Sequence, residues 1–199
     1  QSSATAGAVP RSDRAVAEWV LRAGGFVTLD DRPHQRYWDI TELPADDFRL
    51  HTVNLIGTVV PLEELENLRG LAHLKELYLS GRFWHNVPST QCEQSLRFVE
   101  TLTALERFAV SEPVQTDIPV QDDGLAHVTV LPNLRELRID HMKIKGRTLA
   151  PAKGLRFLDV NFTRFDDEGM RSLAGMTRLE RLLVRDTLIT DEGLASIQD

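Results

Sequence analysis

The chain has 199 residues, of which 42% are hydrophobic and 27% are charged, a composition typical of a globular protein with a buried core. Its 30 acidic residues outnumber its 23 Lys and Arg residues, and the net charge of −7 argues against binding to nucleic acids or anionic membranes, because both need a basic surface. No segment approaches the roughly 20 apolar residues of a membrane-spanning helix, so no membrane insertion is expected. The single cysteine, Cys92, excludes an internal disulfide framework.

The first residues of the chain carry no structural pattern. Residues 1–10 read QSSATAGAVP, which is small, polar and without period, so residues 1–11 are predicted to be a flexible tail or linker. There is no initiator Met and no charged start followed by the apolar stretch of a secretory signal. We therefore expect the chain to be part of a longer or processed protein.

Residues 12–49 are predicted to form a capping segment. The spacing of apolar residues predicts an amphipathic helix over Asp13–Ala23, begun by Ser12 or Asp13 as the N-cap and stopped by the glycines at 24 and 25. Its inward face is predicted to hold Val16, Trp19, Val20 and Ala23. Residues 26–29 are apolar or β-branched and predict a strand. Trp38 and Ile40 are expected to seat the loop that follows.

Six similar segments fill the chain from residue 50 onward. Each has the core pattern L-x-x-L-x-L, with apolar residues at its first, fourth and sixth positions. The units start at residues 50, 74, 105, 134, 155 and 179, and the last two align without a gap, 24 residues apart. Residues 50–199 are therefore predicted to be one repeat domain.

An apolar stripe stands nine, six and three residues ahead of four of these units. Its members are Leu65, Leu68 and Leu71; Leu96, Val99 and Leu102; Leu125, Val128 and Leu131; and Met170, Leu173 and Met176. Each unit is thus predicted to contain a short strand, a turn and a helical segment. One strand and one helix cannot bury both of their apolar faces, so the units must stack, with the strands in a concave parallel sheet and the helices on the convex side.

This pattern resembles the leucine-rich repeat family, in particular the strand–helix type of ribonuclease-inhibitor-like and bacterial repeat proteins. The resemblance covers residues 50–199 and implies an α/β fold, a curved right-handed solenoid with a parallel concave sheet and an N-terminal helical cap. The stretch AEWVLRAGG at residues 17–25 is similar to the leader of some large bacterial leucine-rich repeat proteins. The expected source is therefore a larger bacterial protein, and cytoplasmic and extracytoplasmic locations both stay open.

The turn after each strand departs from the family pattern in the middle of the chain. Family members often place Asn, Cys or Thr three residues after the third core position, where the side chain hydrogen-bonds the turning backbone. The residues at this position are Thr58, Arg82, Pro113, Met142, Thr163 and Thr187. The middle turns are therefore expected to be irregular. The fourth unit is three residues shorter than 24 and contains Pro151, so a loop or a single turn is expected in place of its helix.

The sequence carries no motif for catalysis or metal binding. The six histidines lack ligand spacing, and Cys92 has no companion thiol. No nucleophile elbow, phosphate-binding glycine loop or HExxH motif is present. We therefore predict no enzyme activity, no cofactor and no metal. Acidic runs at residues 122–123, 166–168 and 191–192 each precede a predicted helix and are interpreted as helix caps rather than calcium ligands.

The residues between the core positions point out of the predicted concave sheet and form columns across the strands. One column holds Asn54, Tyr78, Ala109, Arg138, Asp159 and Leu183, and its neighbour holds Thr52, Glu76, Arg107, Glu136, Phe157 and Arg181. From these columns we select Tyr78, Arg138, Phe157, Asp159, Arg181 and Leu183 as candidate partner-binding residues. Aromatic and arginine anchors among mixed charges are typical of protein–protein hot spots. The alternative is a solvated sheet whose charges pair across strands.

Two units are longer than 24 residues, by seven in the second and five in the third. Both insertions fall between strand and helix on one edge of neighbouring units, so they are expected to touch. The first spans 82–88 and contains Phe83 and Trp84; the second contains Val114, Ile118, Pro119 and Val120. Phe83 and Trp84 are candidates for an exposed anchor, whose removal would weaken binding and spare stability. Equally, the pair can pack the two loops on each other.

The sequence therefore predicts a non-catalytic leucine-rich repeat module that binds a protein or peptide with its concave sheet and its insertion-loop edge. A second hypothesis is a structural or spacer array that associates with copies of itself through an uncapped C-terminal end. The last unit stops inside its helix, without a polar closing segment, so either further repeats were removed or this end associates with itself. An enzyme is the third hypothesis, and a deep polar pocket with perturbed titratable groups would favour it.

Overall fold

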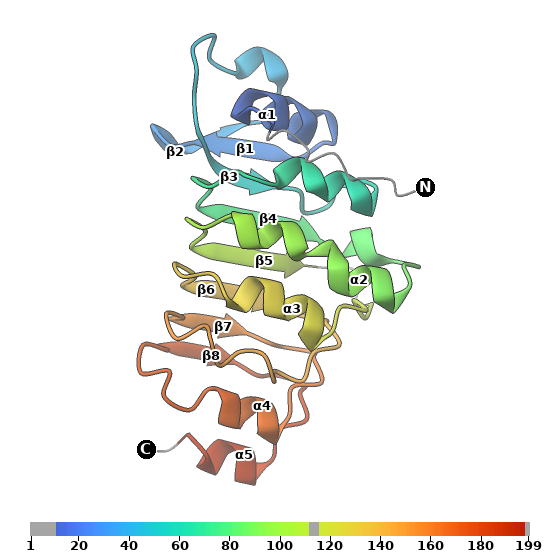
Figure 1. The fold of residues 1–199 in the computed structure, drawn as a ribbon, viewed down its shortest axis with the longest axis vertical. Coiled ribbons are helices and arrows are strands. Elements are labelled where there is room, and N and C mark those ends of the chain that lie inside the picture. The colour runs from blue at the N-terminus through green and yellow to red at the C-terminus, as the bar shows by residue number, and fades with distance from the viewer. Residues whose placement is uncertain (1–10, 112–115, 198–199) are drawn as a thin grey trace, which may run out of the picture.

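The computed structural model describes residues 11–111 and 116–197. All of its strands belong to one eight-stranded sheet with the order β2-β1-β3-β4-β5-β6-β7-β8 (Figure 1). The strands are β1 (Phe26–Leu29), β2 (Arg32–Tyr37), β3 (Leu50–Asn54), β4 (Glu76–Ser80), β5 (Arg107–Ser111), β6 (Glu136–Ile139), β7 (Phe157–Asp159) and β8 (Arg181–Leu183). The expected tail of residues 1–11 lies, apart from Arg11, outside the described residues, as do Val114 and residues 198–199.

The helical segments lie on one side of the sheet and are short. The α-helices are α1 (Asp13–Arg22), α2 (Ser89–Ser95), α3 (Asp122–Thr129), α4 (Asp167–Ser172) and α5 (Asp191–Ala195). The 3-10 helices are η1 (Ile40–Glu42), η2 (Leu62–Leu68), η3 (Gly81–Trp84) and η4 (Arg97–Thr101). Within the described ranges, every helix is too short or too polar to cross a bilayer.

Strands β3 to β8 are all parallel, and their register follows the repeat. The second core positions pair along the whole row, as in Leu77 with Phe108 and Leu137 with Leu158. The outward residues beside them pair in the same way, for example Tyr78 with Ala109. The side-chain period of a strand is two, so this register sends every core residue to the helix side and every column residue to the other side. The predicted parallel sheet and its columns are confirmed.

The apolar stripes ahead of the units form the other half of the core. All twelve of their residues are buried, and they lie within η2, η4, α3 and α4 or a few residues beyond the ends of these helices. The fourth unit has no helix between residues 144 and 155, as Pro151 and its short length predict. Thr58, Thr163 and Thr187 each donate their hydroxyl to the carbonyl three residues earlier, at 2.8, 2.7 and 2.9 Å. The expected threonine turns are therefore present in the first unit and the last two.

The capping segment extends the sheet with an antiparallel hairpin. β1 pairs antiparallel with β3 and with β2, so the edge of the first repeat strand is covered. The predicted helix is confirmed as α1, with Ser12 as its N-cap. Asp13 has a different role, because its Oδ2 accepts the backbone N–H of Leu50 at 2.7 Å and ties the cap to the first repeat. The sequence missed β2, since Arg32, His34 and Arg36 interrupt any apolar alternation.

The expectation that Trp38 seats the loop after the cap is wrong. Its ring lies 4.8 Å from that of Phe26 and remains 55% exposed. Trp19 is the packing residue of this region, because it is half-buried and its Nε1 donates to Glu64 Oε2 at 2.8 Å. The cap is thus joined to η2 of the first repeat by a tryptophan on α1.

The acidic runs cap helices only in part. Asp166 is the N-cap of α4 and accepts the N–H groups of Glu168 and Gly169. Asp122 and Asp167 instead reach into the next repeat, where Asp122 accepts three backbone N–H groups of residues 145–147 and Asp167 accepts from Thr190. The predicted capping role is therefore wrong for these two residues, which link successive repeats.

Candidate partner-binding face

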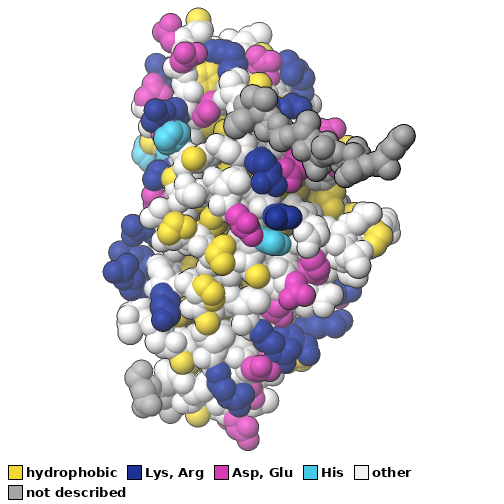
Figure 2. Space-filling view, in the orientation of Figure 1, with side chains coloured by type: hydrophobic (Ala, Val, Ile, Leu, Met, Phe, Trp, Pro, Cys, Tyr) yellow, Lys and Arg dark blue, Asp and Glu magenta, His cyan; other side chains and the backbone are white. Residues whose placement is uncertain are grey.

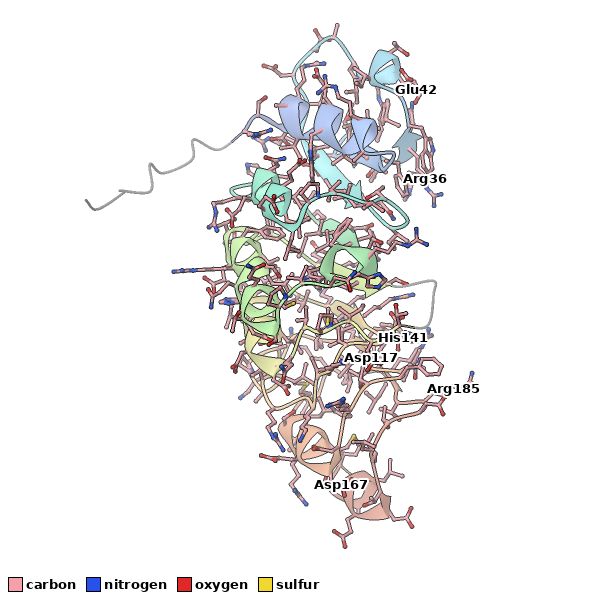
Figure 3. All side chains as sticks on the ribbon, turned by 90° about the vertical axis from the view of Figure 1, so that its right-hand side faces the viewer. Arg36, Glu42, Asp117, His141, Asp167 and Arg185 are labelled. Atoms are coloured by element: carbon pink, nitrogen blue, oxygen red, sulfur yellow. The ribbon has the colours of Figure 1, made fainter. Side chains whose placement is uncertain are left out.

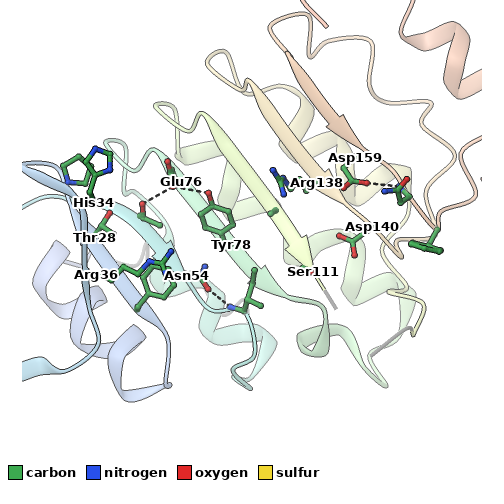
Figure 4. A pocket seen from close by; sticks show the side chains of 17 residues that line it. Thr28, His34, Arg36, Asn54, Glu76, Tyr78, Ser111, Arg138, Asp140 and Asp159 are labelled. Atoms are coloured by element: carbon green, nitrogen blue, oxygen red, sulfur yellow. Dashed lines mark hydrogen bonds between the residues drawn. The ribbon is translucent and has the colours of Figure 1, made fainter. Parts of the chain in front are cut away.

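The face of β3–β8 that points away from the helices carries the predicted columns, and we call it the open face. Figure 3 shows His141 and Arg185 on this side of the molecule, opposite the helix layer, with Arg36 of β2 at its upper end. A groove of about 680 Å³ runs along it (Figure 4). Residues from β2 and from five of the six repeats line the groove, among them His34, Asn54, Tyr78, Ser111, Arg138 and Phe162.

The structure brings six of the eight predicted site residues to this face. Arg138 and Asp159 pair across β6 and β7, and Phe157 pairs with Arg181 across β7 and β8. Tyr78 and Asp159 line the groove, whereas Leu183 lies in the same column on the last strand. These placements follow from the register alone, and their role in binding stays a prediction.

The half of the open face near the cap is internally paired. Arg107 bridges Glu76 and Glu136 on the two neighbouring strands, at 2.5 and 3.0 Å. Glu76 also accepts hydrogen bonds from Thr52 Oγ1 at 3.2 Å and from the Tyr78 hydroxyl at 3.1 Å. This part of the sheet matches the alternative in which charges pair across strands.

Burial and the neighbouring Glu76 keep the Tyr78 hydroxyl in its neutral form. Burial, followed by the charge of Glu76, raises the pKa of the Tyr78 hydroxyl from 10.0 to about 12. We expect the phenolate absorbance of the protein, after subtraction of the Tyr78→Phe variant, to titrate with a midpoint near 12. Because the folded-state pKa is raised, the contribution of Tyr78 to stability is complete below about pH 10 and is lost as the pH rises through 12. A midpoint near pH 10 would contradict this placement.

Farther along the sheet, aromatic and basic residues stack on one another. The guanidinium carbons of Arg138 and Arg181 lie 4.7 and 5.7 Å from the centroid of the Phe157 ring. Asp159, next to this group, is half-buried, and burial raises the pKa of its carboxyl although its hydrogen bond from the Asn161 N–H opposes the shift. Its Oδ1 accepts that N–H at 3.1 Å.

A second row of stacked residues follows the ends of the strands. His141, Phe162 and Asp186 each stand seven residues after the start of a unit and have φ angles of 62°, 57° and 51°. The Phe162 ring stacks on His141 at 4.8 Å, and the guanidinium of Arg185 lies over its other side at 5.5 Å. In the first unit Gly57 occupies this position with φ 82°. A bulky residue in this left-handed region costs about 1–2 kcal/mol of backbone strain.

This backbone strain predicts that glycine is tolerated better than alanine at position 162. Both Phe162→Ala and Phe162→Gly remove the ring contacts, but only glycine also relieves the positive φ. We expect the glycine variant to be more stable than the alanine variant by about 1 kcal/mol in urea unfolding, the reverse of the usual order. An alanine variant as stable as the glycine variant would show that the turn is not held in this conformation.

The prediction that Phe83 and Trp84 form an exposed anchor is wrong. Trp84 is fully buried and Phe83 is 4% exposed, with their rings 6.0 Å apart in η3. The insertions do touch, because Thr116 Oγ1 lies 3.0 Å from His85 Nε2, and Ile118 is buried beneath them. The packing alternative therefore holds, since both rings of the first insertion bury their apolar area inside the protein instead of exposing it to solvent.

Sequence reasoning also missed part of the groove. His34 and Arg36 come from β2, which the sequence did not predict, and Phe162 stands beyond the columns. The seven-residue offset of His141, Phe162 and Asp186 was readable in the repeat alignment, but positive φ angles were not. In the described part of the chain, no group of three or more His, Cys, Asp or Glu residues is placed to hold a metal ion.

Neither the known protein-family models nor the curated protein sequences match this chain. Two solved structures share its architecture. Internalin C2 from Listeria monocytogenes superposes with a TM-score of 0.53 at 20% identity, over 96% of this chain and 86% of that one. The leucine-rich repeat ectodomain of the plant membrane receptor kinase GASSHO1/SCHENGEN3 from Arabidopsis thaliana, in complex with CASPARIAN STRIP INTEGRITY FACTOR 2, superposes with a TM-score of 0.50 at 18% identity, over 89% of this chain. Our chain spans 21% of that ectodomain chain.

These superpositions show a shared fold, whereas the low sequence identities show nothing beyond it. The fold is also visible in the chain itself, in six parallel strands that repeat one register and in the stacked helical segments on one side of the sheet (Figure 1). This chain is therefore a leucine-rich repeat solenoid with an antiparallel cap on its first strand.

Proposed function

We propose that the chain is a recognition module that binds a protein or peptide segment along its open face, without turnover. The observation that carries this proposal is the groove of about 680 Å³, which runs from the cap hairpin across the repeats. Its lining mixes aromatic side chains with charges of both signs, as protein-binding surfaces do. One fold neighbour, the receptor ectodomain, was solved in complex with CASPARIAN STRIP INTEGRITY FACTOR 2, which supports partner binding by a protein of this fold.

The dimensions of the open face suit an extended segment. Six parallel strands spaced ~4.8 Å apart give a width of about 24 Å across the sheet, which an extended chain of about seven residues spans. The alternative of a solvated sheet with paired charges fits the ion pairs of Arg107 with Glu76 and Glu136, but it does not fit the whole open face. Arg138 and Arg181, within the described residues, form no ion pair and stack on Phe157 instead.

The proposal is tested by selection from a displayed library of random 12-residue peptides on the whole chain. We expect enriched peptides whose binding is lost in Tyr78→Ala and Arg138→Ala, both on the open face. The matched controls are Arg97→Ala and Arg171→Ala, exposed arginines of η4 and α4 in the helix layer. Figure 2 shows that the helix side mixes acidic and basic side chains without a large area of one sign.

Peptides that bind all four variants as well as the wild type would overturn the open face as the site. The absence of any enriched peptide after repeated selection would also count against it. Thermal unfolding of each variant checks that a loss of binding is not a loss of fold, since all four side chains lie on the surface or only half-buried.

A second candidate function, self-association, is favoured by the apolar surface of the last repeat. Leu183, Leu188, Leu194 and Ile197 are 37%, 59%, 46% and 40% exposed. Several exposed large apolar residues in one repeat are candidates for an interaction site. We expect light scattering at two concentrations to give a rising mass for the wild type and a constant monomer mass for Leu188→Asp with Leu194→Asp. A constant monomer for both would exclude self-association through this end.

We also propose, from the AEWVLRAGG stretch of residues 17–25, that the module works within a larger bacterial protein. The full gene sequence tests this directly. A gene that encodes only these repeats and their cap would overturn it.

A further inference from the structure

Two arginines flank one phenylalanine on the open face. Arg138 of β6 and Arg181 of β8 come from the strands on either side of Phe157 in β7. Phe157 pairs directly with Arg181, and Arg138 reaches its ring diagonally from two positions along the neighbouring strand. We call these three residues the Arg–Phe cluster.

The Arg–Phe cluster lies in a hollow of about 430 Å³ at the beginning of strands β5–β8. Five arginines, three glutamates and Phe157 line it. The arginines are Arg107, Arg135, Arg138, Arg156 and Arg181, and the glutamates are Glu106, Glu136 and Glu180. An excess of positive charge in this hollow is unexpected in a chain with a net charge of −7.

The glutamates of the hollow are already partnered. Glu136 pairs with Arg107 at 3.0 Å and Glu180 with Arg156 at 3.6 Å. Glu106 pairs with Lys75 at 3.0 Å and lies 3.9 Å from Arg135.

Arg138 and Arg181 are the two lining arginines for which the described part of the chain supplies no ion pair. Asp159, which pairs with Arg138 in register on the neighbouring strand, accepts the backbone N–H of Asn161 with its Oδ1. The Arg–Phe cluster therefore carries two guanidinium groups without an ion pair in the described part of the chain, although the charge of Arg138 acts on the nearby Asp159 carboxyl.

Stacking leaves these two guanidinium groups able to bind a carboxylate. A guanidinium over an aromatic ring uses its flat face, whereas its five N–H donors point outward in its plane. A carboxylate can accept two of these N–H groups side by side. Because the ring already restricts both side chains, less conformational freedom is lost when a ligand binds.

We propose that the Arg–Phe cluster binds two acidic side chains, at positions i and i+2, of an extended segment in a partner protein. Such side chains project from the same side of an extended chain, about 7 Å apart, which suits two guanidiniums that share one ring. The acidic charge of the whole chain disfavours long polyanions such as nucleic acids, so a short acidic segment is the better match. This inference rests on the proposed function of the open face and specifies its ligand.

The test uses the same displayed library of 12-residue peptides. The clones captured by the wild type are expected to be enriched in Asp or Glu at positions i and i+2. The double variant Arg138→Glu with Arg181→Glu is expected to select Lys or Arg at those positions instead, because it reverses the sign of the cluster. The matched control, Arg97→Glu with Arg171→Glu, makes the same change of charge in the helix layer and is expected to select the same acidic peptides as the wild type.

Fluorescence anisotropy then measures the affinity of one selected acidic peptide. Arg138→Ala and Arg181→Ala are each expected to weaken binding by about tenfold to a hundredfold, as for the loss of a hydrogen bond to a charged group. The same peptide with Gln in place of its two acidic residues is expected to lose affinity to a similar degree. Binding of the wild type should weaken as salt is added.

The outcomes separate this inference from the proposed function. Selected peptides that depend on the open face but show no acidic preference would overturn the Arg–Phe cluster as a carboxylate site and leave the proposed function standing. Selection that is indifferent to every open-face variant would overturn both. Tighter binding of a random single-stranded oligonucleotide than of the acidic peptide would also overturn the inference, because it would assign the cluster to phosphates.

Discussion

Trp84→Ala is expected to lower the free energy of unfolding by about 3–5 kcal/mol, the range for truncation of a fully buried aromatic residue. The Trp84 ring is 0% exposed and packs on Phe83 in η3. Its Nε1 donates to Ser95 Oγ at 2.8 Å, and that hydroxyl donates to the Cys92 carbonyl at 2.6 Å. Alanine would leave a large cavity between the insertion and α2 and would remove the hydrogen bond to Ser95.

Trp38→Ala is the control for this change. Trp38 is 55% exposed, so its loss is expected to cost no more than about 1 kcal/mol. Urea unfolding of both variants, followed by far-UV circular dichroism, gives the comparison. If the two substitutions cost the same small amount, the first insertion is loosely packed, and Trp84 becomes a candidate anchor for a partner again.

Asp122→Ala is expected to cost about 2–4 kcal/mol, because three backbone N–H groups lose a charged acceptor at once. Oδ1 of Asp122 accepts from Gly146 at 2.8 Å and from Arg147 at 2.9 Å, and Oδ2 accepts from Lys145 at 2.9 Å. These N–H groups belong to the fourth unit, which has no helix of its own to order them. The carboxylate thus replaces the missing helix as the support of that loop.

Asp123→Ala makes the same chemical change one residue away, at an exposed carboxylate, and is expected to alter stability by less than about 0.5 kcal/mol. Hydrogen exchange adds a local measurement. The amides of residues 145–147 are expected to lose protection in Asp122→Ala and to keep it in Asp123→Ala. Equal protection in both variants would mean that the loop is ordered by its packing rather than by Asp122.

The repeat pattern was sufficient to predict the scaffold of the site. The leucine spacing determined which strands are parallel, how they are paired and which residues share the open face, because a period-two strand in a stacked repeat allows one register that buries its apolar residues. The sequence alone thus places Arg138, Phe157 and Arg181 on the same face of neighbouring strands. The breaks in the pattern were equally informative, since Pro151 and the short fourth unit predicted its missing helix.

The tertiary structure alone decided what happens where the repeat is interrupted. Phe83 and Trp84 are buried, with Trp84 hydrogen-bonded to Ser95 of α2, and the length of an insertion does not reveal on which side its rings pack. Asp122 reaches the next repeat rather than its own helix, and the N–H groups that it accepts belong to a loop more than twenty residues away in the chain. Contacts between regular repeats can be predicted from the sequence because each unit packs against a neighbour of the same pattern. An insertion packs against a surface that forms only when the chain is folded.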